Sequence, residues 1–190
     1  MTTATEILRG EHDAILEMIA TLEAVVQRID ACENIPLETL NGLTEFFVLF
    51  ADQSHHGKEE DLLFPLMERK GVPRCGGPLG CMLAEHDEGR GFIQRMKQNA
   101  ERCARGEEPA RKAWTNAARG YATLLRNHIW KENEILFRMA ERILSPQEQT
   151  ALAEQFAQVQ KEKLDKETQA RLLEGKQKMV SRFLAIASAK

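Results

Sequence analysis

A histidine followed four residues later by a glutamate occurs twice in this sequence, in closely matching surroundings. His55 and Glu59 lie in the segment HHGKEEDLLF, and His128 and Glu132 lie in the segment HIWKENEILF. Both copies have a lysine between the histidine and the glutamate, and an aliphatic-Leu-Phe run after them. Because a helix turns once per about 3.6 residues, side chains four positions apart lie on one face. Each copy is therefore expected to present an imidazole and a carboxylate to the same point.

A neighbouring histidine makes the register of the first copy ambiguous. His56 and Glu60 have the same spacing as His55 and Glu59, but only the latter pair aligns with the second copy. We therefore take His55 and Glu59 as the working pair. His56 is interpreted as a boundary residue, and a place behind the ligands or a role as a substitute ligand is the alternative.

A second repeat carries single histidines. Residues 8–13 (LRGEHD) are answered by residues 82–87 (MLAEHD), so that His12 and His86 share the same Glu-His-Asp context. Four helices that carry all these groups inward would gather four imidazoles and two carboxylates, which is a donor set for two metal ions. Imidazole suits iron, zinc and copper, and carboxylate adds a preference for a harder ion. The lack of cysteine at these positions argues against a closed structural zinc site.

The two glutamates suit a pair of ions a short distance apart, with each carboxylate bridging both. Two carboxylates cancel only half of the charge of two divalent ions, so a bridging oxide or hydroxide is also expected. Such a donor set leaves positions on octahedral iron for solvent or substrate.

Hydrophobic periodicity predicts the helices that must carry these groups. We expect helices over residues 5–32, with Thr5 as the N-cap, over 37–70, from the loop at 71–78 to about 105, and over 110–144. Four long helices with short connections predict an all-α, antiparallel up-down-up-down four-helix bundle. Two further helices, one capped by Ser145 and one over 166–187, contain no candidate ligands. We therefore divide the chain into a bundle of residues 1–145 and a C-terminal helical extension of 146–190, which packs on the bundle or forms a dimer contact.

Composition excludes several classes of protein. The 190 residues are 29% charged and 43% hydrophobic, with a net charge of −3, so electrostatics give no reason to expect nucleic acid or an anionic membrane as partner. No apolar run reaches the roughly 18 residues of a spanning helix. The first residues lack a basic segment followed by an apolar one, which is not typical of a secretory signal, and we expect a cytoplasmic protein. The four cysteines have no metal-site spacing and are expected to be reduced thiols.

The order of these motifs resembles the hemerythrin-like (HHE cation-binding) family over roughly residues 5–144. The resemblance rests on two HxxxE pairs followed by Leu-Phe and on two Glu-His-Asp helices. It implies an antiparallel four-helix bundle around a non-haem di-iron centre. The ligands it implies are His12, His55, Glu59, His86, His128 and Glu132, with the two glutamates bridging.

One position departs from the oxygen carriers of this family. Those proteins have a fifth histidine one turn after the third-helix ligand, and here that position is Arg90. Arginine cannot lose its proton to bind a metal. The chain is therefore more similar to the branch with four histidines and two glutamates, which includes bacterial di-iron proteins that repair iron centres under nitric oxide and oxidative stress.

Residues near the motifs carry smaller hypotheses. Arg90 either steers an anion towards the centre or pairs with carboxylates. Tyr121 lies seven residues before His128, and it either bonds a metal-bound oxygen species or is a core residue. Lys58 and Lys131 are expected to offset the carboxylates. The acidic neighbours of the single histidines either hold imidazole N–H groups or face solvent; they are Glu11, Asp13, Glu85 and Asp87.

The leading functional hypothesis is a di-iron protein that binds and reacts with O2, peroxide or NO at an open coordination position. An enzyme, such as a peroxidase or NO-handling oxidoreductase, is one form of it, and it requires an electron donor. The alternative is a non-catalytic iron-binding, oxygen-sensing or oxygen-carrying module, which releases its ligand intact. A homodimer also stays open. A ferritin-like oxidase or iron store is disfavoured because that class uses Glu-x-x-His pairs. The residues three positions before the histidines are Arg9, Asp52, Gln53, Leu83 and Leu125.

Overall fold

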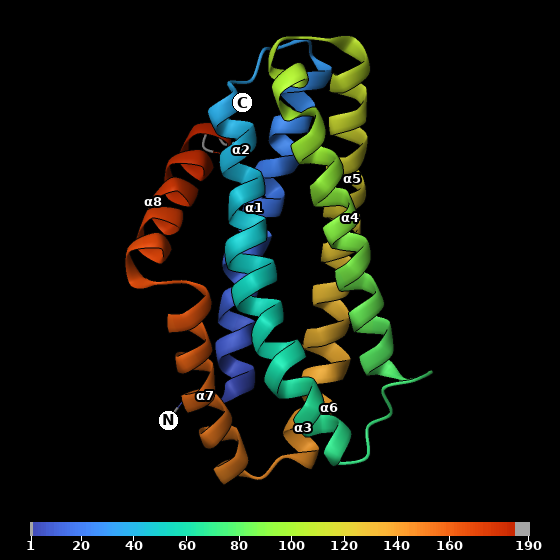
Figure 1. Cartoon of the computed structure of the whole chain (residues 1–190), viewed down its shortest axis with the longest axis vertical. Coiled ribbons are helices and arrows are strands. Elements are labelled where there is room, and N and C mark those ends of the chain that lie inside the picture. Colours follow the sequence, from blue (N-terminus) through green and yellow to red (C-terminus); the bar gives the residue numbers. More distant parts are fainter. Residues whose placement is uncertain (1, 185–190) are drawn as a thin grey trace.

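The computed structural model describes residues 2–184, and all of their regular structure is helical (Figure 1). The predicted all-α class is thus confirmed for this part of the chain. The helices, in chain order, are α1 (Ala4–Asp30), α2 (Leu37–Phe46), η1 (Phe47–His56), η2 (Glu59–Leu63), α3 (Phe64–Arg69), α4 (Pro78–Ala104), α5 (Glu108–Lys131), η3 (Glu132–Leu136), α6 (Phe137–Ile143), α7 (Pro146–Lys163) and α8 (Lys166–Phe183). The segments η1, η2 and η3 are π-helical, which means that their N–H groups bond to carbonyls five residues earlier. The expected end of the last helix at residue 187 lies outside the described residues.

Several of these helices join end to end into longer columns. The segments α2 to α3 form one continuous column, and α5 to α6 form another. These two columns stand beside α1 and α4, and α7 and α8 run along the outer side (Figure 1). The helix α5 packs against both α4 and α1, and α2 packs against α4. Four long columns therefore surround a common interior.

The starts of two helices show how local sequence sets their ends. The hydroxyl of Thr3 accepts from the backbone N–H of Glu6, whose carboxylate accepts from the Thr3 N–H in return. This capping box starts α1 two residues before the predicted N-cap, so the prediction of Thr5 was wrong. The predicted cap of α7 is confirmed, because Ser145 and Glu148 form the same reciprocal pair.

The apolar interior is divided into two clusters, and the histidines lie between them. The larger cluster includes Ile15 of α1 and Ile129 of α5, and the smaller includes Leu8 of α1 and Leu136 of η3. His12 lies between Leu8 and Ile15 along α1, and Glu132 lies between Ile129 and Leu136. Apolar packing on both sides thus positions a polar layer in the middle of the columns.

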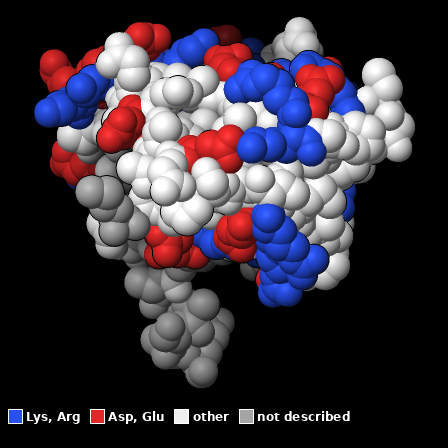
Figure 2. Space-filling model, turned by 90° about the horizontal axis from the view of Figure 1, so that it is seen from below, with Lys and Arg blue, Asp and Glu red and all other residues white. Residues whose placement is uncertain are grey.

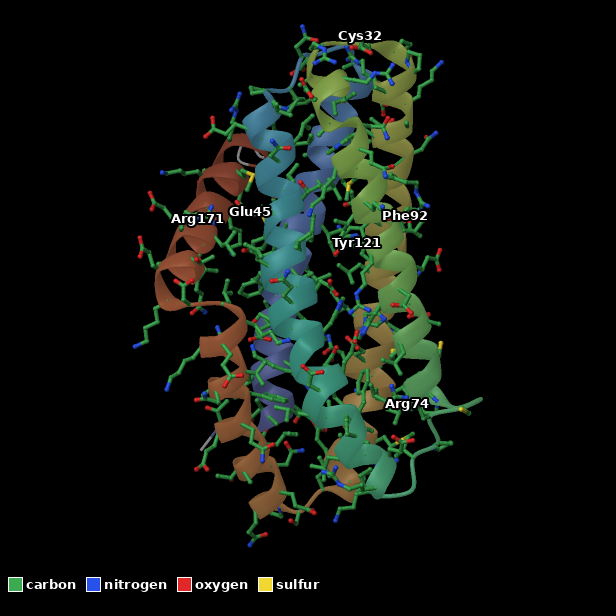
Figure 3. All side chains as sticks on the ribbon, viewed as in Figure 1. Cys32, Glu45, Arg74, Phe92, Tyr121 and Arg171 are labelled. Atoms are coloured by element: carbon green, nitrogen blue, oxygen red, sulfur yellow. The ribbon has the colours of Figure 1, made fainter. Side chains whose placement is uncertain are left out.

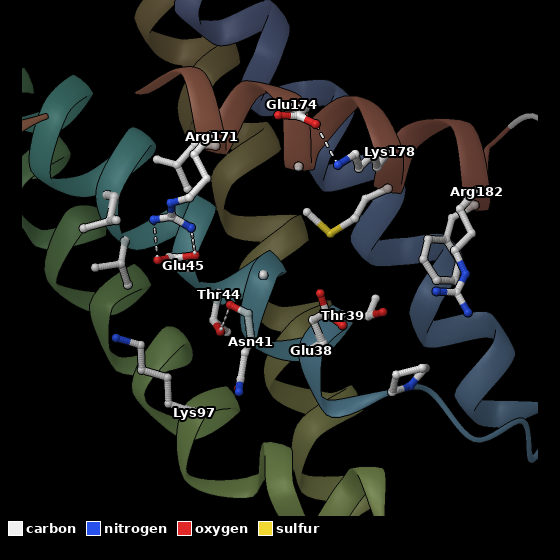
Figure 4. A pocket seen from close by; sticks show the side chains of 18 residues that line it. Glu38, Thr39, Asn41, Thr44, Glu45, Lys97, Arg171, Glu174, Lys178 and Arg182 are labelled. Atoms are coloured by element: carbon white, nitrogen blue, oxygen red, sulfur yellow. Dashed lines mark hydrogen bonds and ion pairs between the residues drawn. The ribbon is translucent and has the colours of Figure 1, made fainter. Parts of the chain in front are cut away.

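The C-terminal helices pack on the columns rather than standing free. Phe156 of α7 belongs to the smaller apolar cluster, and Leu172 and Phe183 of α8 belong to the larger. The guanidinium of Arg171 also donates to both carboxylate oxygens of Glu45 on α2, at 2.8 and 2.9 Å (Figure 4). The extension therefore shares the core of the rest of the chain.

The surface carries charges of both signs. On the face drawn in Figure 2, basic and acidic side chains are interspersed, and neither sign covers that face. Within residues 2–184, no helix combines the length and low charge that crossing a membrane requires.

Candidate metal centre

Two pairs of histidines meet in the polar layer. The Nε2 atoms of His12 and His55 lie 3.0 Å apart, and those of His86 and His128 also lie 3.0 Å apart. All four imidazoles are buried. Metal–nitrogen bonds of about 2.0–2.1 Å place neighbouring ligand atoms about 3.0 to 3.4 Å apart. The spacing within each pair is therefore that of two ligands of one ion.

The outer nitrogen of each of these imidazoles faces an oxygen from another helix. The Nδ1 atoms of His55, His86 and His128 lie 2.7 to 2.9 Å from carboxylates, and that of His12 lies 2.9 Å from the Asn133 amide oxygen. An ionised carboxylate can only accept, so Nδ1 donates and the lone pair remains on Nε2. The carboxylates are those of Glu11 for His55, Glu60 for His86 and Glu85 for His128. The inward nitrogens are thus in the form that binds a metal.

Glu59 and Glu132 complete the layer, and each reaches both histidine pairs. One oxygen of Glu59 lies 3.8 Å from His55 Nε2, and its other oxygen lies 3.6 Å from His86 Nε2. The two oxygens of Glu132 lie 3.1 Å from His12 Nε2 and 3.0 Å from His128 Nε2. Both side chains are fully buried, and neither has a hydrogen-bond partner among the described residues. Each carboxylate is therefore placed between the two pairs.

Buried lone pairs that face one another need a cation. Imidazole nitrogens and carboxylate oxygens converge here, and in neutral imidazoles the outward Nδ1 bonds leave no N–H to lie between them. Uncompensated buried acceptors of this kind are strongly unfavourable in a protein interior. Two overlapping groups, His12 with His55, Glu59 and Glu132, and His56 with Glu59, His86 and His128, have the compactness to hold a metal ion. The residues present fit a pair of cations.

The pKa values of residues in the centre also reflect burial and the closeness of like groups. Burial, and then the adjacent Glu132 carboxylate, raise the pKa of Glu59 well above its usual value. Burial lowers the pKa of His55 to about 4, which keeps that imidazole neutral. Burial alone would also lower the pKa of His128, but the Glu132 and Glu85 carboxylates outweigh it and raise that pKa to about 9. A metal ion would therefore compete with a proton at His128.

Comparison with known proteins agrees with this geometry. The hemerythrin HHE cation-binding domain matches residues 3–140, which include all the residues of the polar layer. The chain belongs to this family.

Relatives within the hemerythrin family extend the comparison. An uncharacterized protein of Mycobacterium tuberculosis is 23% identical over 154 residues, covering 81% of this chain and 60% of the relative. The iron-sulfur cluster repair protein YtfE of Escherichia coli O157:H7 is 31% identical over 103 residues, covering 52% of this chain and 47% of YtfE. The chain thus spans about half to three fifths of the length of these relatives. No solved structure matches.

The six residues that the hemerythrin resemblance implied as ligands all lie in the polar layer. The groups that hold their outer nitrogens were predicted only in part. Glu11 and Glu85 hold imidazoles, as one alternative proposed, but Asp13 is exposed and Asp87 pairs with Arg90. Glu60 and Asn133 were missed. Each directly follows a repeat glutamate, so their shared position in the two copies was a usable signal.

His56 is placed differently from our interpretation. It is only 5% exposed and lies in the metal-compatible group with Glu59, His86 and His128. The interpretation as a boundary residue was therefore wrong. On an α-helix, adjacent residues such as His55 and His56 would point about 100° apart. The segment η1 is instead π-helical, so each residue advances by a smaller angle and both histidines can be buried.

Arg90 and Tyr121 border the centre on this side. The Arg90 guanidinium donates to Asp52 at 2.9 Å and to Glu60 at 2.6 Å, so the carboxylate-paired alternative describes it. Tyr121 points from α5 into the interior (Figure 3), and its buried hydroxyl has no hydrogen-bond partner among the described residues. It lines a cavity of about 10 Å³ beside His56, His86 and His128. That volume is about enough for one water molecule.

Proposed function

We propose that this protein holds two iron ions, without haem, and reacts with small oxygen or nitrogen species such as O2, peroxide or NO. His12 and His55 would bind one ion, and His86 and His128 the other. Glu59 and Glu132 would bridge them, with an oxide or hydroxide as a further bridge. The observation that carries this proposal is the orientation of both carboxylates, each with one oxygen towards each histidine pair.

The surrounding residues support a reactive centre rather than a structural one. An iron pair supplies electrons to a small bound molecule. Imidazole and carboxylate are the donors that suit iron, whereas closed structural zinc sites favour thiolates. The acceptors behind the imidazoles fix the ring orientations, and the two apolar clusters exclude bulk water. The YtfE relatives named for iron-sulfur cluster repair make a role in oxidative or nitrosative stress the natural setting.

The remaining expectations complete the proposal. We infer an antiparallel up-down-up-down bundle over residues 1–145 with the extension 146–190 packed on it. We also propose a cytoplasmic location and an electron donor that restores the reduced state. The alternative function is a non-catalytic iron-binding, oxygen-sensing or carrying module, which would use the same ligands and release the bound molecule unchanged.

Metal content and spectroscopy of anaerobically purified protein test the proposal. We expect about two irons per chain and charge-transfer bands that change when O2, peroxide or NO is added. A band that decays while the added molecule is consumed supports an enzyme, and one that reverses on removal of the gas supports the carrier or sensor. A Glu132→Gln variant should lose iron, whereas Glu134→Gln, on the same helix but outside the layer, should keep it. A single tightly bound zinc that responds to none of these molecules would contradict the proposal.

A further inference from the structure

We propose that the outer face of the column from α5 to α6 is the contact through which two copies of this chain form an antiparallel homodimer. The centre of this face is a row of exposed side chains spaced four positions apart, Trp130, Glu134, Arg138 and Arg142. Residues at this spacing are neighbours on the surface of a helix. The row contains none of the residues of the polar layer, so the inference is independent of the proposed function.

Two large apolar side chains are exposed on this face. Trp130 is 60% exposed and Ile135 is 48% exposed, and among the described residues only Leu37 on α2 is a further large apolar side chain of this kind. Single exposed apolar residues are ordinary, but a tryptophan beside a second apolar group is typical of an interface. A tryptophan is also the side chain that most often anchors a protein contact.

A hollow on the same face offers a place for such an anchor. It has a volume of about 280 Å³ and is lined by Glu134, Ile135, Arg138, Met139, Arg142 and Ile143. Its apolar side chains and its arginine guanidiniums are the partners that an indole ring prefers, through dispersion and cation–π contact. Trp130 of the same chain is not among the lining residues. An indole that enters this hollow therefore comes from a second copy.

A two-fold axis across the middle of the row brings these features together. In an antiparallel pair, each member of the row meets the member at the opposite end. Trp130 of one copy then meets Arg142 and the hollow of the second copy, and Glu134 meets Arg138 of the second copy. The contacts are reciprocal, as a two-fold interface requires. A parallel pair would instead set Arg138 against Arg138 and leave both hollows without an indole.

The charges along the row favour the antiparallel arrangement. Within one chain, the Glu134 carboxylate lies 2.5 Å from the Arg138 guanidinium. Two such pairs that approach in opposite directions form a group in which each carboxylate has a guanidinium on either side. Beside the row, Arg9 of α1 pairs with Glu141 at 3.0 Å. A partly apolar centre with a charged rim is the usual composition of a protein interface.

The rest of the fold leaves this face open. The helices α7 and α8 pack against α1, α2 and the π-helical segments η1 and η2, on the side of the molecule away from α5 (Figure 1). The row covers about four turns, which is about 20 Å of helix. A contact of that length is small for a stable complex, and we expect a dissociation constant of roughly micromolar size.

Sedimentation equilibrium of the full chain tests the dimer. We expect a monomer that becomes a dimer as the concentration rises, and a dissociation constant at least about tenfold larger for Trp130→Ala. Leu37→Ala is the matched control, because it removes a similarly exposed apolar side chain outside the face, and it should associate as wild type does. A protein that stays monomeric up to about 1 mM, or a dimer unaffected by Trp130→Ala, would overturn the inference.

A charge exchange tests the antiparallel direction. Glu134→Arg sets like charges against each other at two places in the dimer, and we expect at least about tenfold weaker association. Adding Arg138→Glu to that variant restores opposite charges at both places and should restore the wild-type dissociation constant. A double variant as weak as Glu134→Arg would contradict the proposed pairing, because exchanged charges are equivalent only if these two residues meet.

Tryptophan fluorescence gives a readout that needs no variant. The chain has two tryptophans, and Trp114 is already fully buried. A shift of the emission to shorter wavelength as the concentration rises would therefore report that Trp130 leaves water. We expect this shift to follow the same concentration dependence as sedimentation. Dimer formation without the shift would place the contact on another face and overturn the inference, also where a variant does not fold.

Discussion

Two lysines occupy the same place in the two copies of the repeat but differ in burial. Lys58 pairs with Glu11, which also accepts from His55, and Lys131 pairs with Glu85, which also accepts from His128. Lys58 is fully buried and donates to Gln160 of α7 at 2.9 Å, whereas the Lys131 side chain is 29% exposed. The same ion pair is therefore enclosed in one half and open to solvent in the other.

Replacement of the two lysines should have unequal effects on stability. Lys58→Met leaves the Glu11 carboxylate, which is only 13% exposed, without its cation, and we expect a loss of about 3 kcal/mol in the free energy of unfolding. Lys131→Met should cost less than about 1 kcal/mol, because solvent already screens that pair. Urea denaturation of both variants measures the difference. Equal losses would show that burial of Lys58 does not increase the contribution of its ion pair to the free energy of unfolding.

Tyr121 tests whether the small molecule binds on the side of the centre that contains His86 and His128. Its buried hydroxyl has no hydrogen-bond partner among the described residues, and it lines the cavity beside His86 and His128. We therefore expect Tyr121→Phe to change the free energy of unfolding by less than about 1 kcal/mol and to shift the spectrum of the azide adduct of the loaded protein, because the hydroxyl is free to bond a molecule bound on this side. An unchanged adduct spectrum with unchanged iron content would place the small molecule away from Tyr121.

At the scale of the elements, the first turn of α1 depends on Thr3. Loss of an N-cap oxygen leaves a backbone N–H without its partner and typically costs about 1 kcal/mol. We expect Thr3→Ala to lose about that much in urea denaturation. Thr2→Ala is the matched control, because Thr2 is exposed and lies before the cap, and it should behave as wild type. If Thr2→Ala lost as much stability as Thr3→Ala, the assignment of Thr3 as the N-cap would be contradicted.

The repeats made much of the centre predictable, and the π-helices limited what could be predicted. Spacing of four between His and Glu is satisfied on an α-helix, so His55 with Glu59 and His128 with Glu132 were found without knowledge of the backbone. Nothing in residues 47–56 distinguishes a π-helical from an α-helical segment by apolar periodicity alone, and His56 was misplaced for that reason. Contacts between distant helices, such as Arg90 with Asp52, depend on the packing of whole columns and have no local signal.

At the scale of the whole molecule, the polar layer between the two apolar clusters should make stability depend on the proposed metal ions. A cation that binds only the folded chain stabilises it by about 2.7 kcal/mol at a concentration 100 times its dissociation constant. For a chain of this size that corresponds to a rise of roughly 5 to 10 °C in Tm. We expect removal of metal with a chelator to lower Tm by about that amount in differential scanning calorimetry.

A double variant supplies the control for this prediction. Glu59→Gln combined with Glu132→Gln removes the two buried carboxylates that require a cation, while it keeps their size. Its Tm should not respond to the chelator, and it should exceed that of the metal-free wild type. A chelator-sensitive double variant would mean that the metal acts outside the polar layer.

The enclosure of Lys58 also gives the molecule a built-in chemical reporter. Amine-reactive reagents modify lysines that they can reach, and α7 covers this ammonium group through Gln160. In the intact protein, acetic anhydride should modify Lys131 and leave Lys58 unmodified, and mass spectrometry of the digested chain would read both sites at once. Labelling of Lys58 would then report the moment at which the C-terminal helices lift away, before the rest of the chain has unfolded.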